Sequence, residues 1–384
     1  MKVIFANRSD CLTHRGGDTV QMLKTKEYLE SNFGVSIVLV LNASELYNFK
    51  NYDLVHIFNI QTASQTIDFI KAAKELNIPI ILSPIYWNLW HSFVISKTYD
   101  FISWPFYKYF SHFESLGRLL WKFIPKKDTS YLGVRYKSQG DFILSNVDYI
   151  LPNSYEEIDN LCRDFGLSET NCAALKNKSV AVPNAIENKK QPQYLNDNFA
   201  KIYKLPKDYV LVVGRIEPNK NQLSVLLALL NEKDIPIVFV GRKSSNSIDL
   251  KYGTKLEEIA ATRGNVYFIP EVKHEDMYEI YKSAAVHVLA SFRESPGLVT
   301  LEALKAGSKI VFSSRSFCPV DFYGLKNYGS ECNPYDVASI KSAILYEINL
   351  KRDVDNNEFF ERFSYDIVAK KTFDVYRMFV KKNM

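Results

Sequence analysis

The feature that most constrains the fold of this chain is an alternation of apolar runs and helical patterns that occurs twice. Near-continuous apolar runs, typical of buried parallel strands, recur through both halves. They lie at 2–7, 35–41, 52–58, 78–85 and 149–151, and again at 209–213, 235–240, 266–269, 286–290 and 310–313. Strands that alternate with helices pack as doubly wound parallel sheets. The sequence therefore predicts an α/β chain with two Rossmann-like doubly wound domains, and we expect them to face each other across a cleft.

Domain boundaries follow from changes in this pattern. The first domain is predicted at 1–186, with an aromatic and basic insertion at 86–137. A polar, irregular stretch at 187–206 reads as a linker. The second domain is predicted at 207–364, and residues 365–384 have the pattern of a final helix.

Composition narrows the class of protein. The chain has 384 residues, 47% of them hydrophobic and 24% charged, which suits two globular domains. A net charge of +5 is too modest to indicate nucleic-acid binding. The N-terminal stretch contains too few apolar residues for a signal peptide. No apolar run in the sequence is long enough to span a bilayer.

The cysteines indicate a compartment. The five lie scattered, without Cys-x-x-Cys or metal-ligand spacing, at Cys11, Cys162, Cys172, Cys318 and Cys332. An odd, scattered set predicts reduced thiols and a cytoplasmic protein.

A strand, loop and helix at 286–307 form the strongest candidate site. Ser295 is the expected N-cap, Pro296 suits the first turn, and Gly307 can end the helix. Backbone N–H groups at the start of such a helix attract phosphate. We expect the N–H groups near Gly297, Leu298 and Val299 to do so.

Two carboxylates flank this phosphate site. Glu294 precedes the helix and Glu302 lies in its second turn. A carboxylate beside a bound phosphate is poorly placed to bind the anion, so each is expected to accept hydrogen bonds from sugar hydroxyl groups.

Two cations end the first strand of the second domain. Arg215 and Lys220 stand at the carboxyl end of a strand, where doubly wound sheets bind ligands, in the run Gly214-Arg215-Ile216-Glu217-Pro218-Asn219-Lys220-Asn221. Arginine can bind phosphate with two parallel hydrogen bonds, and lysine acts as a compact charge.

The Glu-x7-Glu pair within the loop Ser-Pro-Gly-Leu, together with the Gly-Arg…Lys run, resembles a known family. It resembles the retaining, nucleotide-sugar-dependent glycosyltransferases called family 4 or group 1, which have the two-domain GT-B fold. The resemblance implies that Glu294 touches the transferred sugar and Glu302 holds the nucleotide ribose. It also implies a final helix that crosses back to the first domain, and front-face attack with retention of configuration.

The resemblance adds the Gly16–Gly17 pair after the first strand, which is similar to the family's glycine loop at the donor phosphate and the acceptor. A plain flexible turn is the alternative. The catalytic candidates are therefore Glu294, Arg215 and Lys220. The donor-binding candidates are Glu302, Gly297, Leu298, Val299, Gly16 and Gly17. We expect no metal and no other cofactor, because the sequence has no Asp-x-Asp and the two cations can neutralise the departing phosphate.

The chain departs from the family at one point. Many members have a histidine after the fourth strand that touches the donor sugar, whereas this strand runs into Pro84-Ile85-Tyr86-Trp87. His91 or His56 can replace it, but a lone histidine is more often structural.

The insertion at 86–137 has two interpretations. It holds all four tryptophans and a helical aromatic stripe with a basic face. The basic residues include Lys108, Arg118, Lys122, Lys126, Lys127, Arg135 and Lys137. Such a segment suits an anionic membrane surface, which would make the protein peripheral on the inner face of the membrane. The alternative is a helix packed on its own domain with a solvated basic face.

The sequence thus predicts a retaining hexosyltransferase that moves a sugar from a nucleotide-diphosphate donor to a hydroxyl group. The acceptor is expected to be a saccharide or a lipid-linked molecule, in surface glycan or glycolipid assembly of the bacterial type. Two alternatives remain. One is a non-catalytic sugar-nucleotide-binding or membrane scaffold protein, and the other is an epimerase or phosphorylase of the same fold.

Overall fold

The chain divides into two compact units, which are described separately. The computed structural model describes residues 1–13, 16–88, 90–98, 134–187, 202–243, 246–270, 272–273, 276–295, 297–350 and 357–380. Unit 1 combines 1–88, 119–188 and 361–384, and unit 2 combines 89–118 and 189–360. The cleft that we expect between them stays a prediction.

Unit 1 is built on a parallel sheet of five strands in the order β2-β1-β3-β4-β5. The strands are β1 (Lys2–Ala6), β2 (Ser36–Val40), β3 (Leu54–Phe58), β4 (Ile80–Ser83) and β5 (Tyr149–Ile150). Every residue of β3 is buried, as a sheet covered on both faces requires.

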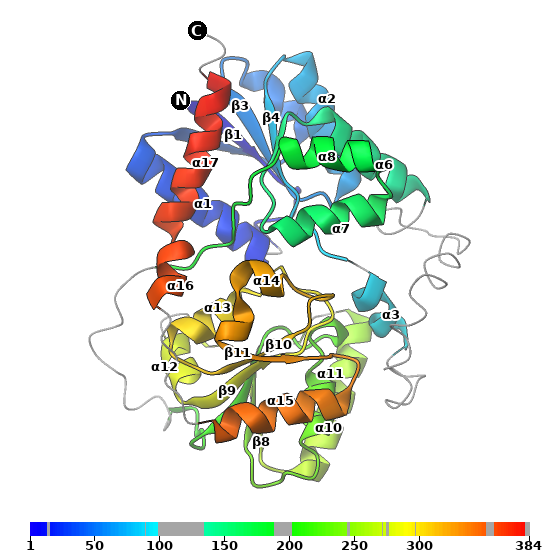
Figure 1. Ribbon diagram of the computed structural model, residues 1–384, viewed down its shortest axis with the longest axis vertical. Helices are drawn as coiled ribbons and strands as arrows, with labels where there is room; N and C mark the ends of the chain where they lie inside the picture. The colour runs from blue at the N-terminus through cyan, green and yellow to red at the C-terminus, as the bar shows by residue number, and fades with distance from the viewer. Residues whose placement is uncertain are drawn as a thin grey trace. The chain divides into compact units, whose positions relative to one another are not determined.

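The helices of unit 1 cover this sheet (Figure 1). They are α1 (Gly17–Phe33), η1 (Ala43–Asn48), α2 (Ala63–Glu75), α6 (Val134–Asn146), α7 (Tyr155–Phe165), α8 (Glu169–Asn177) and α17 (Tyr365–Val380). The C-terminal α17 packs on α1, and two pairs of stacked rings, Tyr28–Tyr365 and Phe33–Phe373, hold the helices together.

Unit 2 has a parallel sheet of six strands in the order β11-β10-β9-β6-β7-β8. The strands are β6 (Tyr209–Val213), β7 (Ile237–Val240), β8 (Val266–Ile269), β9 (Ala284–Leu289), β10 (Ile310–Ser313) and β11 (Gly329–Cys332). Its helical segments are α3 (Trp90–Thr98), η3 (Pro218–Lys220), α10 (Gln222–Ala228), α11 (Ser247–Arg263), α12 (Met277–Lys282), α13 (Leu298–Lys305), α14 (Val320–Tyr323), η5 (Leu325–Asn327) and α15 (Val337–Asn349). The short α16 (Asn357–Arg362) precedes the return of the chain to unit 1.

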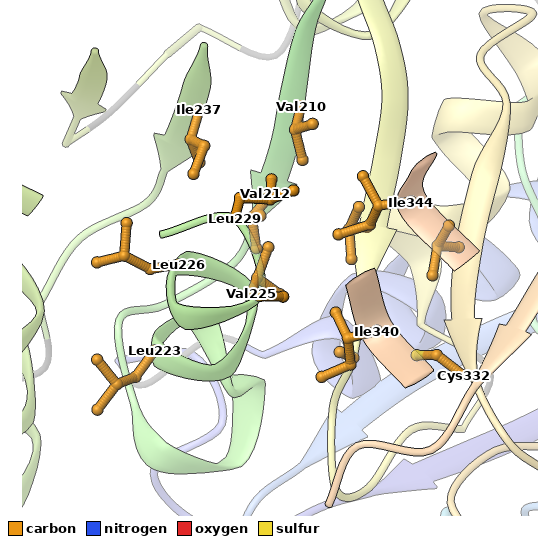
Figure 2. Packing of buried hydrophobic residues seen from close by; sticks show 14 of the residues in the cluster. Val210, Val212, Leu223, Val225, Leu226, Leu229, Ile237, Cys332, Ile340 and Ile344 are labelled. Atoms are coloured by element: carbon orange, nitrogen blue, oxygen red, sulfur yellow. The ribbon is translucent and has the colours of Figure 1, made fainter. Parts of the chain in front are cut away.

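The core of unit 2 lies between its sheet and two helices (Figure 2). Val210 and Val212 of β6 meet Leu226 of α10 and Ile340 and Ile344 of α15, and all five side chains are buried. Burial of apolar area stabilises the fold by ~25 cal/mol per Å², so this cluster contributes to the stability of the six-stranded sheet.

The prediction of five reduced cysteines is wrong. Cys162 of α7 and Cys172 of α8 form a disulfide, with Cα atoms 5.6 Å apart. The two residues are ten positions apart, and the turn between the helices brings them together. Cys11, Cys318 and Cys332 are buried and lie outside this disulfide.

The insertion predicted at 86–137 falls partly outside the described residues. Its aromatic and basic stretch at 99–133 cannot be compared with the structure, whereas Trp90–Thr98 forms α3 and packs within unit 2. Among the described residues, no helix is both long and apolar enough to cross a membrane.

Candidate functional site

The candidate site lies at the carboxyl ends of two neighbouring strands of unit 2. β6 and β9 pair side by side, so the segments that follow them meet at the same edge of the sheet. There Lys220 Nζ lies 2.6 Å from Glu294 Oε1. Their side chains are 19% and 9% exposed, so the pair is largely shielded from water without being fully buried. The structure therefore brings together two of the three predicted catalytic residues.

The turn that carries Lys220 is fixed by the residue after it. Asn221 has a left-handed backbone (φ 59°), which ends η3 and starts α10. Its side-chain Nδ2 donates to the carbonyls of Ala290, at 3.0 Å, and Pro334, at 2.8 Å. In the same turn the N–H of Phe292 donates to the carbonyl of Asn219 at 2.9 Å. Asn221 ends the Gly-Arg…Lys run but received no role from the sequence, although an asparagine at a strand-to-helix turn is a signal for this backbone.

The loop that carries Glu294 is fixed from its other side. The N–H of Glu294 donates to the carbonyl of Phe317 at 2.8 Å. Gly297 adopts φ 86°, and a Cβ there would lie 2.6 Å from Leu289 Cδ2 and 3.3 Å from Glu294 Oε2. Only glycine suits this position without strain, because the backbone is left-handed and the space beside Glu294 is taken.

The helix after this loop begins later than expected. α13 starts at Leu298 with Gly297 as N-cap, so the prediction of Ser295 as the cap is wrong. The left-handed Gly297 redirects the chain and delays the helix. Pro296 lies outside the described residues. At the other end Gly307 has φ 82°, as a helix-terminating glycine does.

The start of α13 presents backbone N–H groups. The N–H of Thr300 donates to the carbonyl of Gly297 at 2.9 Å. Leu298 and Val299 occupy the first turn, where no carbonyl lies one turn earlier in the helix to accept their N–H groups. These are two of the three positions expected to face a phosphate.

Glu302 is held by a tyrosine that the sequence analysis missed. The Tyr281 hydroxyl donates to Glu302 Oε2 at 3.0 Å. Burial of Tyr281 and the neighbouring Glu302 carboxylate raise the pKa of this hydroxyl well above its usual value, so it stays a donor. Tyr281 lies on α12, and no sequence motif marks it as the partner of Glu302.

Arg215 differs from Lys220 in its surroundings. Its side chain is 70% exposed, and one guanidinium nitrogen lies 3.3 Å from Glu217 Oε2. Its backbone carbonyl accepts a hydrogen bond of 2.7 Å from Gln222 Nε2, which fixes the main chain while the side chain extends into solvent.

Gly16 and Gly17 belong to unit 1, where Gly16 is the N-cap of α1 and Gly17 its first residue. A Cβ on Gly16 would lie 2.6 Å from Asp18 Oδ1. Next to α1, a cavity of about 40 Å³ opens at the carboxyl ends of β3, β4 and β5. Its polar lining includes Asp18, Gln21, Thr25, Ser83, Asn153 and Asn184. The sequence analysis did not anticipate this cavity.

His56 and His91, the two candidates to replace the family's histidine, are both buried, and each forms a hydrogen bond with a tyrosine. His56 Nδ1 lies 2.6 Å from Tyr376 Oη, and its Nε2 lies 2.9 Å from Ser83 Oγ. Burial lowers the pKa of His56 to about 3, so it is neutral. His91 Nδ1 lies 2.8 Å from Tyr335 Oη. These contacts favour the structural interpretation of both.

The part of the chain that the structure describes contains no group of three or more His, Cys, Asp or Glu side chains arranged to hold a metal ion.

Comparison with known proteins places this site in a family. Residues 176–357 match the family model described as glycosyl transferases group 1. This stretch is a glycosyl transferases group 1 domain. It includes Arg215, Lys220, Glu294 and Glu302, and nearly all of the unit 2 sheet and its helices.

Curated relatives match only part of their length. An uncharacterized glycosyltransferase of Methanocaldococcus jannaschii is 31% identical over 182 residues, which is 44% of each chain. The D-inositol 3-phosphate glycosyltransferase of Mycobacteroides abscessus is 30% identical over 114 residues, 29% of this chain and 25% of that protein. The chain thus spans less than half the length of these relatives in the match.

Solved structures match the whole chain in fold. Sucrose-phosphate synthase of Thermosynechococcus elongatus has a TM-score of 0.71 at 16% identity, covering 98% of this chain and 99% of that one. HepE of Anabaena, in complex with UDP and glucose, has a TM-score of 0.66 at 12% identity, covering 98% and 100%. The two parallel sheets of five and six strands are those of the GT-B glycosyltransferases, as the sequence predicted.

Proposed function

We propose that this chain transfers a sugar from a nucleotide-diphosphate donor to a hydroxyl group with retention of configuration. The observation that carries the proposal is the contact between Lys220 and Glu294 at the carboxyl edge of β6 and β9. It sets a cation and a carboxylate side by side at the start of α13, inside a group 1 domain. A phosphate and a sugar are the ligands that such a pair can bind together.

Each residue has a chemical role in this proposal. When the bond between sugar and diphosphate breaks, negative charge grows on the departing phosphate. Lys220, Arg215 and the N–H groups of Leu298 and Val299 are donors suited to that charge. Glu294 accepts hydrogen bonds from the sugar hydroxyls.

The ribose is assigned to Glu302. Tyr281 holds one oxygen of this carboxylate in place. A carboxylate can accept more than one hydrogen bond, so Glu302 can bind ribose hydroxyls while Tyr281 orients it. Gly16 and Gly17, at the start of α1 in unit 1, are proposed to complete the donor site.

For the donor we propose a UDP-hexose. The support is that HepE, which shares the fold, is solved in complex with UDP and with UDP-glucose. For the acceptor we propose a saccharide or a lipid-linked molecule. A lipopolysaccharide outer core galactosyltransferase shares the fold at a TM-score of 0.59, and relatives of the group 1 domain act on D-inositol 3-phosphate.

A place at the inner face of the membrane is part of the proposal. It rests on the aromatic and basic sequence at 86–137. Liposome flotation of the wild type against a variant with Lys108, Arg118, Lys122, Lys126 and Lys127 changed to Glu tests it. Equal, salt-independent flotation of both proteins would reject it.

The proposal as a whole is tested by donor binding followed by turnover. Thermal unfolding is measured with UDP-, GDP- and ADP-sugars, since a ligand at 100 times its Kd adds ~2.7 kcal/mol of stability. The stabilising donor is then incubated with a panel of saccharide and lipid-linked acceptors in the presence of the wild type or Glu294→Gln, and release of the nucleotide diphosphate is followed. We expect release by the wild type and a large loss in the variant. Binding without release in either would indicate a non-catalytic sugar-nucleotide-binding protein.

A further inference from the structure

One helix of unit 2 comes from a distant part of the sequence. α3 follows β4 of unit 1 in the chain, yet its contacts place it within unit 2. Ile95 of α3 is 1% exposed and belongs to the same hydrophobic core as Val212 and Ile340. α3 also packs against η3, the turn that carries Lys220. The turn that carries Lys220 therefore packs against α3, a segment outside the matched residues 176–357.

α3 meets the site through a cluster of four rings, His91, Phe292, Phe317 and Tyr335, which we call the α3 ring cluster. His91 and Tyr335 are 2% and 3% exposed and share a hydrogen bond of 2.8 Å. The His91 ring lies edge-on to Phe317, with centroids 4.8 Å apart. Phe292 packs on Tyr335 at 4.7 Å. Each ring touches at least two others.

Residues of this cluster are linked to the two segments that carry Glu294 and Lys220. Phe317 accepts the backbone N–H of Glu294, and Phe292 stands two residues before Glu294 in the same loop. Tyr335 follows Pro334, whose carbonyl accepts a hydrogen bond from the residue after Lys220. A shift of the cluster would therefore move Glu294 and Lys220.

We propose that His91 is a positioning residue for the Lys220–Glu294 pair, acting through its hydrogen bond to Tyr335. The bond restrains the Tyr335 ring, which packs against Phe292 of the Glu294 loop. The carbonyl of the preceding Pro334 accepts the hydrogen bond from Asn221 in the Lys220 turn. This inference rests on the proposed role of Glu294 in transfer. Small displacements of a group that binds the reacting sugar lower the rate more than they lower nucleotide affinity.

The test uses Tyr335→Phe, which removes the hydroxyl and keeps the ring. We expect release of nucleotide diphosphate from the donor to fall ~10-fold, a part of the ~10²-fold that a 1 Å misplacement costs. The affinity for UDP, measured by calorimetry, should change less than 2-fold. His91→Phe should lower the release rate by a similar factor and leave UDP affinity similarly unchanged. The double variant His91→Phe/Tyr335→Phe should be no slower than either single variant, because both substitutions remove the same hydrogen bond.

The chain offers a matched control in unit 1. His56 and Tyr376 form a second buried pair, with Nδ1 2.6 Å from Oη. Tyr376→Phe loses the same kind of bond and should lower the unfolding temperature as much as Tyr335→Phe does. Its rate of nucleotide release should equal that of the wild type.

A second readout separates this inference from the proposed function. Hydrogen exchange, followed by mass spectrometry, should become faster in peptides covering 215–221 and 291–299 in Tyr335→Phe, and not in Tyr376→Phe. Unchanged exchange there would overturn the positioning role, whatever the activity. If Glu294→Gln releases nucleotide as fast as the wild type, the proposed function fails. If Glu294→Gln is slow and adding Tyr335→Phe slows it ~10-fold further, Tyr335 does not act through Glu294 and the inference fails.

Discussion

Each of the two sheets has a buried glutamate at its carboxyl edge, and the two are stabilised in different ways. Glu294 in unit 2 faces the ammonium group of Lys220 at 2.6 Å. Glu157 in unit 1 lies on α7 and accepts the backbone N–H groups of Tyr86, at 2.6 Å, and Asn153, at 2.5 Å. These two carboxyl groups therefore contact an ammonium group in unit 2 and backbone N–H groups in unit 1.

The different partners suggest a structural role for Glu157 and a ligand-binding role for Glu294. Glu157 is fully buried, and its two bonds tie together the segments that follow β4 and β5. Burial raises the pKa of Glu157 to about 8, although the two amide bonds act in the opposite direction. Glu294 keeps a cation beside it and a side chain that is 9% exposed, so it can still meet a ligand. Under the proposed function, the carboxyl edge of unit 2 is therefore the one expected to bind the charged donor.

The largest effect is expected from Lys220→Met, which keeps an unbranched side chain and removes the charge. Release of nucleotide diphosphate from the donor should slow by ~10²–10³-fold, as for loss of one donor to a charge that grows in the transition state. Steady-state kinetics with the stabilising nucleotide sugar measures this.

Lys341→Met is the control for that loss. Lys341 Nζ lies 2.6 Å from Glu232 Oε1, the same separation, but both side chains are more than 30% exposed, at 37% and 34%. This variant should retain wild-type turnover, because exposed pairs contribute little. Equal losses in the two variants would mean that the edge of β6 and β9 has no special role.

A somewhat smaller loss, ~10²-fold in turnover, is expected for Arg215→Ala. Because the charge that Arg215 meets grows during bond cleavage, donor affinity should fall less than turnover does. Glu217→Gln, which removes the carboxylate 3.3 Å from Arg215, should retain most activity. An Arg215 variant with normal turnover and only a raised KM would show that Arg215 binds ground state and transition state alike.

Glu302→Gln should weaken binding without abolishing chemistry. Loss of a charged hydrogen bond to ribose costs ~1.5–3 kcal/mol, for UDP and UDP-sugar alike. Tyr281→Phe removes the hydrogen-bond donor to Glu302 and should weaken the binding of UDP and of UDP-sugar by ~0.5–1.5 kcal/mol. Glu294→Gln should leave UDP binding nearly intact. Calorimetry decides this, and equal loss of UDP affinity in the two glutamate variants would contradict the assignment of sugar and ribose.

The sequence carried much of this architecture because the relevant signals are local. Apolar runs predicted nearly every strand. The Gly-Arg…Lys and Glu-x7-Glu spacings singled out Arg215, Lys220, Glu294 and Glu302 as candidates, and the structure places Lys220 in contact with Glu294. Their meeting at one edge depends on β6 pairing with β9, which lies three strands later in the chain, and no local pattern determines that pairing.

Other features depend on tertiary contacts or on backbone conformations that residue patterns do not show. The ends of α7 and α8 bring Cys162 to Cys172, and α3 leaves the sequence of unit 1 to pack in unit 2. Gly297 delays α13 because its backbone is left-handed, whereas Ser295 alone read as a good cap. Tyr281 received no role from the sequence, because helical periodicity can indicate burial but not the partner of a hydroxyl group.

The smallest effect expected concerns Glu157 and appears in stability rather than activity. The pKa of Glu157 is about 8 in the folded protein and near 4.5 when exposed, so only the folded state holds this proton between those values. The resulting stabilisation is complete below pH 4.5 and is lost as the pH rises towards 8. Between pH 6 and pH 7 the free energy of unfolding of unit 1 should fall by about 1.4 kcal/mol from this group alone.

Glu157→Gln removes the proton exchange and keeps one oxygen to accept a hydrogen bond from Tyr86 or Asn153. Urea unfolding at pH 6 and pH 7 should therefore show a weaker pH dependence in the variant than in the wild type, while transfer kinetics change little. If the wild type shows no such fall, the two amide donors outweigh burial and keep Glu157 ionised. The two glutamates would then differ only in their partners, and the contrast between the edges would depend on Lys220 alone.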